Sequence, residues 1–489
     1  MRPLPCTAIH NAPGASLLHL TDTLTRRVEA IEPSTPGRLS VYACGPTVYR
    51  YAHVGNLRTF LLTDLIRRTA GLHGLRVQVV QNITDVGHMA DDRGLEEAGE
   101  DKILSQAKAE NRAALDVARF YEDAYMLDLG RLNIAPADIA PRASESIQLM
   151  IDLIATLIER GNAYVGGDGS VYFDSRSFEG YGAISGNKLD ALRPGLRFAV
   201  EEDPEAKDRK RFHADWALWK VAGDTRTQLV WDTPWGVGFP GWHIECSAMS
   251  LHHLGTTIDV HTGGIDLRFP HHEDEKAQSD AAAGHSVVRH WVHAEHLLFE
   301  GRKMAKSTGN VLLLQDVIDR GIDPLALRLS FLEHHYRQQM NLTWNAVDAA
   351  ATLLDRWRMR VAEWAEAPSE PMDETARSAV VSAFDDDLDT PSAIQVLRRL
   401  EKDDAVSPGT KFETFAHLDR LLGLDLVREV GRPRVAPVLP DGAQALLDER
   451  AAARVGKDWG GSDRLRDELA AIGVAVIDTK DGQEWGLTP

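Results

Sequence analysis

The sequence predicts an α/β protein built on a parallel sheet, followed by a mainly helical C-terminal region and a small final domain. Its 489 residues exceed the roughly 250–300 residues that one hydrophobic core supports, so at least two domains are expected. A strand, a loop, a helix and a second strand follow one another within residues 39–80, which is the pattern of a βαβ unit. From about residue 311 the hydrophobic pattern is mostly helical.

The βαβ unit begins with a short apolar run at residues 39–43, which predicts a buried strand. A helical pattern covers residues 55 to about 69, and a valine-rich run at 76–80 predicts the second strand. Parallel strands need a crossover connection, so the helix between them predicts parallel pairing. The alternating residues 257–261 predict a further strand.

The other segments are assigned from composition and pattern. Residues from about 100 to 160 are helical in pattern, and an irregular, charge-dense and glycine-rich stretch continues to about 230. Thr390 is expected to cap a helix whose first position is Pro391. Three prolines within 432–440 indicate a linker, so a small final domain is expected at 441–489.

Composition excludes several classes of protein. Hydrophobic residues make up 43% of the chain and charged residues 26%, which is typical of globular proteins and not of fibrous or disordered ones. No apolar run approaches the roughly 18–20 residues that cross a bilayer, and the N-terminus does not have the pattern of a signal peptide. The net charge of −19 means that any contact with nucleic acid must use local basic patches. The three cysteines are too few for a disulfide framework, which indicates a reducing compartment.

A first candidate site lies between the end of the first strand and the start of the helix. In a parallel sheet, this loop belongs to the carboxyl edge, where ligands bind. His53 and Asn56 are placed at a helix N-terminus, where backbone N–H groups and the helix dipole favour phosphate. Gly55 between them allows a ligand to approach the backbone. An alternative interpretation of this segment is a helix cap with a surface histidine.

A second candidate is the segment Lys303-Met-Ala-Lys306-Ser307-Thr-Gly-Asn310. Two lysines three residues apart in a loop flanked by glycines can both reach one polyphosphate. An exposed basic turn is the alternative. The presence of the His-Val-Gly-Asn segment upstream in a βαβ unit favours nucleotide binding.

A third candidate is a metal cluster. Cys44, Cys246, His271 and Glu275 offer two thiolates, an imidazole and a carboxylate, a donor set that suits zinc. His271 and Glu275 are four residues apart, so on a helix they share a face. His272 is a rival ligand, and the cysteines are alternatively buried apolar residues.

Together these segments resemble the cysteinyl-tRNA synthetases, a family of class I aminoacyl-tRNA synthetases, over about residues 20–485. The family's strand-end cysteine, His-Ile-Gly-His/Asn and Lys-Met-Ser-Lys-Ser motifs match the segments at 44, 53–56 and 303–307, with alanine in place of the middle serine. Its zinc segments match residues 241–249 and 269–275. Further similar segments are 82–85, 385–391 and 457–459. Cys6 matches nothing in the family, and the chain lacks a basic C-terminal tail.

The resemblance implies a Rossmann-type parallel-sheet catalytic domain with an insertion, followed by a helical region and a small anticodon-binding domain. The implied division is an N-terminal extension at 1–38, the two halves of the catalytic domain at 39–125 and 231–298, a connective-peptide-type insertion at 126–230, the lysine loop and stem-contact region at 299–340, a helical bundle at 341–430 and the anticodon-binding domain at 441–489.

The resemblance also implies the activity of a cysteine–tRNA ligase. Cysteine is activated with ATP to cysteinyl-adenylate and pyrophosphate and is then transferred to the 3′ end of tRNA-Cys. One Zn²⁺ per chain selects the thiol, and Mg²⁺ accompanies ATP. The implied site residues are His53, Asn56, Lys303 and Lys306 for catalysis; these four with Gly55 and Ser307 for ATP; Gly45, Thr47, Trp242 and Asp266 for cysteine; Cys44, Cys246, His271 and Glu275 for the metal; and Arg464, Arg466, Asp467 and Trp485 for tRNA.

We further expect a monomer in the cytoplasm with no membrane partner. Two other functions are alternatives. An ATP-dependent cysteine amide ligase of the mycothiol pathway shares the zinc and nucleotide motifs but lacks an anticodon-binding part. A zinc-dependent regulatory paralogue would have a broken nucleotide site, whereas His53, Lys303 and Lys306 are all present. Residues 426–489 carry nine basic and eleven acidic side chains, so the final domain is not basic.

Overall fold

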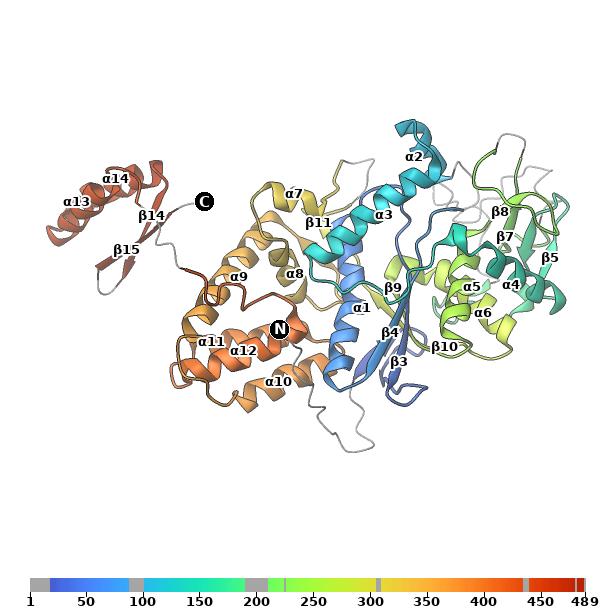
Figure 1. Cartoon of the computed structure of the whole chain (residues 1–489), viewed down its shortest axis with the longest axis horizontal. Coiled ribbons are helices and arrows are strands. Elements are labelled where there is room, and N and C mark those ends of the chain that lie inside the picture. Colours follow the sequence, from blue (N-terminus) through green and yellow to red (C-terminus); the bar gives the residue numbers. More distant parts are fainter. Residues whose placement is uncertain are drawn as a thin grey trace. The chain divides into compact units, whose positions relative to one another are not determined.

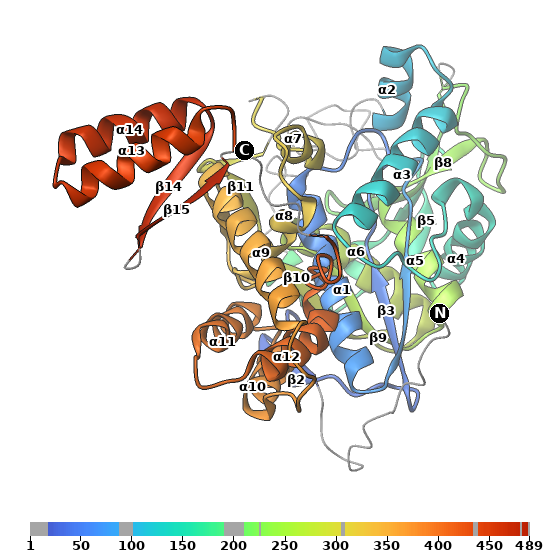
Figure 2. The same ribbon diagram turned by 60° about the vertical axis from the view of Figure 1, so that its left-hand side comes forward.

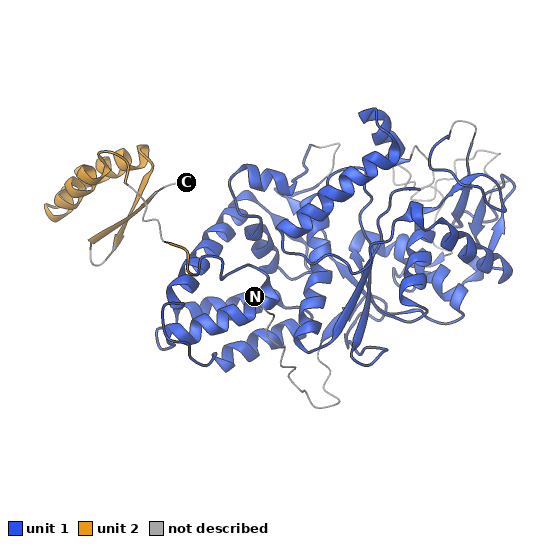
Figure 3. Ribbon diagram, in the orientation of Figure 1, with its two compact units in different colours: residues 1–430 blue, residues 431–489 orange. Residues whose placement is uncertain are grey.

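The structure is a computed structural model that describes residues 18–87, 101–189, 210–223, 226–304, 309–433, 439–479 and 482–487. The chain divides into two compact units, residues 1–430 and 431–489, which Figure 3 distinguishes by colour. Within the described residues, none of the helices has the length and apolar character required to cross a bilayer.

A four-stranded parallel sheet forms the centre of the first unit, with strand order β10-β9-β3-β4 (Figure 1). Its strands are β3 (Arg38–Ala43), β4 (Arg76–Gln81), β9 (Ile258–Gly264) and β10 (Val288–Ala294). The strands predicted at 39–43, 76–80 and 257–261 are thus confirmed, as is their parallel pairing.

Helices cover both faces of this sheet because alternate residues of each strand point to opposite sides. α1 (Val54–Leu72) crosses from β3 to β4 and packs on the face that carries Val41, Val79 and Val260. α5 (Trp242–Leu254) contributes Cys246 to the core on the other face, which contains Tyr42 and Val80. α6 (His271–Ala283) connects β9 to β10 and packs against α5. α5 and α6 are therefore placed to carry side chains toward the end of β3.

A long insertion separates β4 from α5. Its helices are α2 (Lys102–Glu110), α3 (Ala114–Arg131) and α4 (Ile147–Glu159), followed by an antiparallel sheet of β5 (Ala163–Val165), β6 (Val171–Phe173), β7 (Trp216–Val221) and β8 (Gly238–Pro240). The prediction of an irregular stretch up to about residue 230 is therefore wrong for the described part. Aromatic residues stabilise this sheet, as Phe173 stacks on Trp216 with 4.5 Å between ring centroids.

The part of the first unit that follows the parallel sheet is mainly helical, as predicted. A small sheet comes first, formed by β11 (Leu297–Phe299), β12 (Arg302–Lys303) and β13 (Met340–Leu342). Between β12 and β13 the chain forms α7 (Leu314–Asp319) and α8 (Pro324–Leu332). The helices α9 (Trp344–Trp364), α10 (Glu374–Asp385), α11 (Thr390–Lys402) and α12 (Pro408–Leu422) lie grouped together in Figure 2. The predicted cap of α11 is wrong by one residue: the Asp389 side chain accepts a hydrogen bond from the Ser392 N–H at 3.1 Å, and Thr390 is the first helical residue.

The described part of the N-terminal segment forms a hairpin of β1 (His19–Asp22) and β2 (Arg27–Ala30). Asp22 accepts a hydrogen bond from the N–H of Trp291 in β10, at 2.8 Å, and Asp387 accepts one from the N–H of Thr21, also at 2.8 Å. The hairpin therefore links the central sheet with the segment between α10 and α11. Cys6 lies outside the described residues.

The second unit contains α13 (Ala443–Val455), α14 (Trp459–Ala471) and an antiparallel pair, β14 (Val474–Thr479) and β15 (Gly482–Leu487). Its small core is formed by Ala443, Leu447, Leu469 and Val474. Arg450 is fully buried and donates to Asp478 at 2.9 Å and to Gln483 at 2.7 Å, which ties α13 to the strand pair. Residues 434–438 of the predicted linker lie outside the described residues.

Candidate functional site

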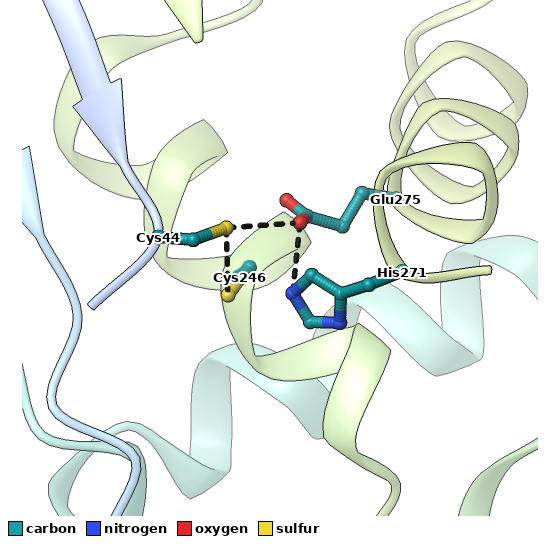
Figure 4. Close-up of side chains that lie close together, drawn as sticks. All are labelled: Cys44, Cys246, His271 and Glu275. Carbon is teal, nitrogen blue, oxygen red and sulfur yellow. Dashed lines mark hydrogen bonds and ion pairs between the residues drawn. The ribbon is translucent and has the colours of Figure 1, made fainter. Parts of the chain in front are cut away.

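The structure brings together the four side chains that the sequence singles out as metal ligands. Cys44 directly follows β3, and Cys246 lies in the first half of α5. His271 is the first residue of α6, and Glu275 lies one turn further on. Figure 4 shows the four side chains converging from these three segments.

The distances among these groups are short. Cys44 Sγ lies 3.3 Å from Glu275 Oε1 and 4.0 Å from Cys246 Sγ, and His271 Nε2 lies 3.0 Å from Glu275 Oε1. One donor atom from each residue lies within 4.8 Å of the other three. Tetrahedral donors about 2.0–2.3 Å from zinc lie roughly 3.3–3.8 Å from one another, so the observed separations bracket those of a zinc site.

The four side chains of the cluster are buried, and burial disfavours their charged forms. The exposed fraction is 5% for Cys44, 1% for Cys246 and for His271, and 2% for Glu275. Burial raises the pKa of the Cys44 thiol and raises the pKa of the Glu275 carboxyl to about 8. A divalent cation among these groups would reverse that effect, because it favours the ionised forms of both.

Two further histidines lie against the same cysteine. His272 Nε2 lies 3.2 Å and His261 Nε2 lies 3.4 Å from Cys44 Sγ. Cys44, His261, His272 and Glu275 thus form a second set that could hold a metal. The geometry keeps His272 as the rival ligand that the sequence indicated, although its neighbour one turn on, Lys276, is paired with Asp280.

Two of the residues expected to bind cysteine lie beside this cluster, because Gly45 follows Cys44 in the chain and Trp242 contacts His271. Gly45 donates its N–H to Asn82 Oδ1 at 2.8 Å, and Thr47 forms an isolated parallel bridge with Thr84. The ring of Trp242 lies 4.2 Å from that of His271, centroid to centroid. Asp266 follows β9, and its side chain is exposed.

The phosphate-binding segment predicted from sequence is the start of α1. His53 is the N-cap: its Nδ1 accepts a hydrogen bond from the Asn56 N–H at 3.2 Å, and Asn56 Oδ1 accepts one from the His53 N–H at 3.2 Å. Desolvation, together with the nearby charge of Arg50, lowers the pKa of His53 to about 4, so the imidazole is neutral at neutral pH. Since Nδ1 accepts, the ring proton is on Nε2, where it can be donated to a ligand.

The lysine segment approaches the same helix start. A Cβ added to Gly55 would lie 2.8 Å from Met304 Cε, so the backbone of α1 touches the residue that follows Lys303. The Val54 N–H also donates to the Leu312 carbonyl at 3.0 Å. Lys303 itself lies at the end of β12 and is exposed. Lys306 and Ser307 lie outside the described residues.

The residues expected to contact tRNA differ in their surroundings. Arg464 and Asp467 are exposed on α14, and Arg464 lies 3.6 Å from Glu468. Arg466 donates to Asp478 at 3.0 Å, the carboxylate that also binds the buried Arg450. Trp485 is half-buried against the core of the second unit.

Sequence reasoning missed the histidines that surround the cluster. His243 follows Trp242 in α5, and its Nδ1 lies 2.9 Å from His271 Nδ1. On the other side, His293 Nε2 lies 2.8 Å from His272 Nδ1. No periodicity marks these residues as neighbours, because they come from separate elements. The density of histidines in the matched segments was the one available signal.

Two family models match the chain. "tRNA synthetases class I (C) catalytic domain" matches residues 30–352, and "Cysteinyl-tRNA ligase anticodon binding domain" matches residues 436–485. Among similar curated proteins, a cysteine–tRNA ligase of Thermus thermophilus is 42% identical over 96% of this chain and 99% of its own length. One of Opitutus terrae is 40% identical over the same shares.

Solved structures with similar folds are more distant in sequence. A LeuRS–tRNA–LeuAMS complex of Agrobacterium radiobacter K84 matches with a TM-score of 0.57 and 10% identity, covering 80% of this chain and 84% of that one. Methionyl-tRNA synthetase of Mycobacterium tuberculosis with methionyl-adenylate matches with a TM-score of 0.52 and 17% identity, covering 87% and 96%. These likenesses concern the fold alone, and they agree with a Rossmann-type catalytic sheet.

The close backbone approach at Gly45 generates a prediction. A Cβ at this position would lie 1.7 Å from the Asn82 carbonyl oxygen, so Gly45→Ala should separate the ends of β3 and β4 and displace Cys44. We expect a loss of about 1–3 kcal/mol in the free energy of unfolding, as for overpacked cores, together with weaker binding of Zn²⁺. Urea unfolding and titration with a chelator measure the two effects. Gly71→Ala in α1 is the matched control, because a Cβ there meets nothing within 4 Å. Equal stability and metal affinity of Gly45→Ala and wild type would contradict the argument.

Proposed function

The chain belongs to the cysteine–tRNA ligase family of class I aminoacyl-tRNA synthetases, and we propose that Cys44, Cys246, His271 and Glu275 hold a zinc ion with which it selects cysteine. Its activity is the ATP-dependent attachment of cysteine to tRNA-Cys by way of cysteinyl-adenylate. The observation that carries the metal proposal is the convergence of these four buried donors from three segments of the chain.

The donor set supports zinc over harder cations. Two thiolates and one imidazole favour Zn²⁺, whereas Mg²⁺ and Ca²⁺ prefer oxygen ligands. When bound, zinc would supply a Lewis acid that prefers a thiolate to a neutral hydroxyl, so these four residues would hold the group that favours cysteine over serine. A plain pocket separates such similar substrates weakly, and this ligand set would supply the missing discrimination.

We propose that the surrounding residues hold the rest of the amino acid. Gly45 and Thr47 follow Cys44 on the same loop, and Trp242 lies against the His271 ring, so these residues would line the pocket. Asp266 would bind the substrate amine. Its charge opposes the lowering of the His53 pKa, which indicates that the carboxylate lies near the start of α1.

The start of α1 is proposed to bind the phosphates of ATP. The neutral His53 would donate from Nε2, Asn56 from its side-chain amide, and the helix N-terminus would contribute its backbone N–H groups near Gly55. Neutrality of His53 suits a hydrogen-bond donor that does not exchange protons with the substrate.

Lys303, Lys306 and Ser307 are proposed to close over the triphosphate, which Mg²⁺ accompanies. The contact between Met304 and Gly55 supports this role because Met304 directly follows Lys303. The first reaction is attack of the cysteine carboxylate on the α-phosphorus, so it needs no nucleophile from the protein. These residues therefore act by positioning and by stabilising the charge that develops on the phosphates.

The second unit is proposed to read the anticodon. Residues 436–485 match the family's anticodon-binding domain. As noted for the resemblance, the amide ligases of the mycothiol pathway have no such domain. Arg464 and Asp467 are exposed and suited to direct contact. Arg466, tied to Asp478, and Trp485, half-buried, are proposed to contribute through the shape of the surface.

We also propose that the protein acts in the cytoplasm as a monomer. Both described cysteines are free thiols, which a reducing compartment preserves. A single chain supplies all four residues of the metal cluster and the start of α1, so no second copy is needed to complete that site. The domain limits predicted from sequence remain part of this proposal.

The zinc proposal gives the first prediction. Purified wild-type protein should contain one zinc per chain by elemental analysis, and Cys246→Ser should lose most of it, because a hydroxyl replaces a thiolate ligand. Ser250→Ala, one turn further along α5, is the control and should retain the metal, because among the described residues the Ser250 hydroxyl bonds only the Ser247 carbonyl. ATP–pyrophosphate exchange with cysteine and with serine should show reduced preference for cysteine in Cys246→Ser. Full zinc occupancy in that variant would contradict the ligand set.

A second prediction concerns Lys306. Lys306→Ala should slow adenylate formation by roughly 10²–10³-fold, because the lysine stabilises charge chiefly in the transition state. The affinity for cysteine should change little. Cysteine-dependent ATP–pyrophosphate exchange and equilibrium binding of cysteine separate the two effects. Arg302→Ala, which removes a neighbouring exposed cation from β12, is the control. An unchanged exchange rate would remove Lys306 from the mechanism.

A third prediction tests the second unit. A chain that ends before residue 441 should retain cysteine-dependent ATP–pyrophosphate exchange, because the proposed adenylation residues all precede it. Charging of tRNA should fall, and the salt dependence of tRNA binding should become flatter as phosphate contacts are lost. Equal charging by the full-length and shortened chains would contradict the anticodon role. Transfer of cysteine by the full chain to an aminosugar but not to tRNA would support the amide ligase instead.

A further inference from the structure

The second ring nitrogen of His271 faces away from the metal cluster. Its Nε2 lies 3.0 Å from Glu275 Oε1, while Nδ1 lies on the far side of the ring (Figure 4). There it meets Nδ1 of His243 at 2.9 Å. Both histidines are buried, with exposed fractions of 1% and 6%. The contact is therefore a hydrogen bond between two imidazoles, and one of the two nitrogens must donate.

Proton counting decides which nitrogen donates when a metal is bound. A neutral imidazole carries its proton on one nitrogen only. If His271 binds a metal through Nε2, its proton must be on Nδ1, and His243 Nδ1 must be the acceptor. His243 then carries its own proton on Nε2. If instead His243 Nδ1 carried the proton, His271 Nδ1 would have to accept it, and the Nε2 lone pair needed for the metal would be lost.

In this arrangement the Nε2–H of His243 needs an acceptor, and the Asp274 carboxylate lies beside it. His243 Nε2 lies 3.5 Å from Asp274 Oδ2, and the other oxygen of Asp274 accepts a hydrogen bond from the Tyr181 hydroxyl at 2.6 Å. Asp274 is 2% exposed. Tyr181 belongs to the insertion and stacks on Trp216 of β7, with 5.5 Å between centroids. A chain of polar contacts thus runs from Tyr181 to His271, and the Tyr181 ring stacks on a residue of the antiparallel sheet.

We propose that His243 is a positioning residue that fixes the tautomer and ring orientation of His271 for metal binding, with Asp274 and Tyr181 holding His243 in turn. This inference rests on the proposed zinc site. The proposal also allows the two possible ligand sets to be distinguished by mutation, because His271 and His272 are supported by different residues. The rival ligand His272 has His293 Nε2 at 2.8 Å from its Nδ1, and His293 Nδ1 in turn lies 2.7 Å from Thr23 Oγ1.

Zinc affinity of the full-length chain, measured by competition with a chromophoric chelator, tests the proposal. His243→Leu should weaken zinc binding about 10–100-fold, the usual effect of losing a hydrogen-bond partner of a ligating histidine. His243→Asn should restore most of the affinity, since its amide oxygen can accept at the position of Nδ1. A purely structural role would lower the melting temperature of the metal-free protein in both variants and would not follow this order.

Further variants keep the test decisive. If His243→Leu does not fold, Tyr181→Phe removes a single hydroxyl and should still weaken zinc binding measurably. His293→Leu is the matched control on the other side of the cluster and should bind zinc like wild type. Wild-type affinity in both His243→Leu and Tyr181→Phe, or loss of affinity in His293→Leu alone, would overturn the proposal. A wild-type chain that binds no zinc would instead overturn the proposed function.

Discussion

The burial of two cysteines, a histidine and a glutamate in one small region is the constraint on which the site depends. Removing ionisable groups from water costs free energy unless they are neutralised, paired or bound to a metal. Here burial raises the pKa of Glu275 to about 8, so a neutral carboxyl is favoured in the absence of a cation. The structure holds one donor atom of each of the four side chains within 4.8 Å of the others, so a single cation could compensate all of them.

That requirement explains several features of the fold. Gly45 lies against the backbone at Asn82, which brings the ends of β3 and β4 together and directs Cys44 toward α5. α6 begins at His271, so the ligand and Glu275 lie on one face from the first turn. The insertion also contributes, because Tyr181 reaches Asp274 on α6. The insertion is thereby connected to the central sheet in two ways: by packing, and by the Tyr181–Asp274 hydrogen bond beside the cluster.

Local patterns made much of this predictable. The segment from β3 to β4 was predicted because a short apolar run, a helical pattern and a valine-rich run follow one another there. The four cluster residues were predicted from their donor types and from the resemblance of their segments to those of a known family. The sheet of β5–β8 was missed because three of its strands have only three residues each. Thr390 was predicted as the cap because Pro391 was expected at the first helical position, whereas Pro391 is the second helical residue and Asp389 is the cap. The His243–His271 contact could not be predicted, since it joins two helices.

The cluster and the start of α1 lie at opposite ends of one loop, and this arrangement relates specificity to catalysis. Cys44 and His53 are nine residues apart, and both follow β3 at the carboxyl edge of the sheet. If the proposed zinc holds the substrate sulfur near Cys44, the rest of the amino acid would extend along this loop toward the proposed phosphate site. An amino acid without a thiol would then be both weakly bound and poorly placed for attack on ATP. The contact proposed to recognise the thiol would thus also position the reacting carboxylate, so specificity and rate would depend on one interaction.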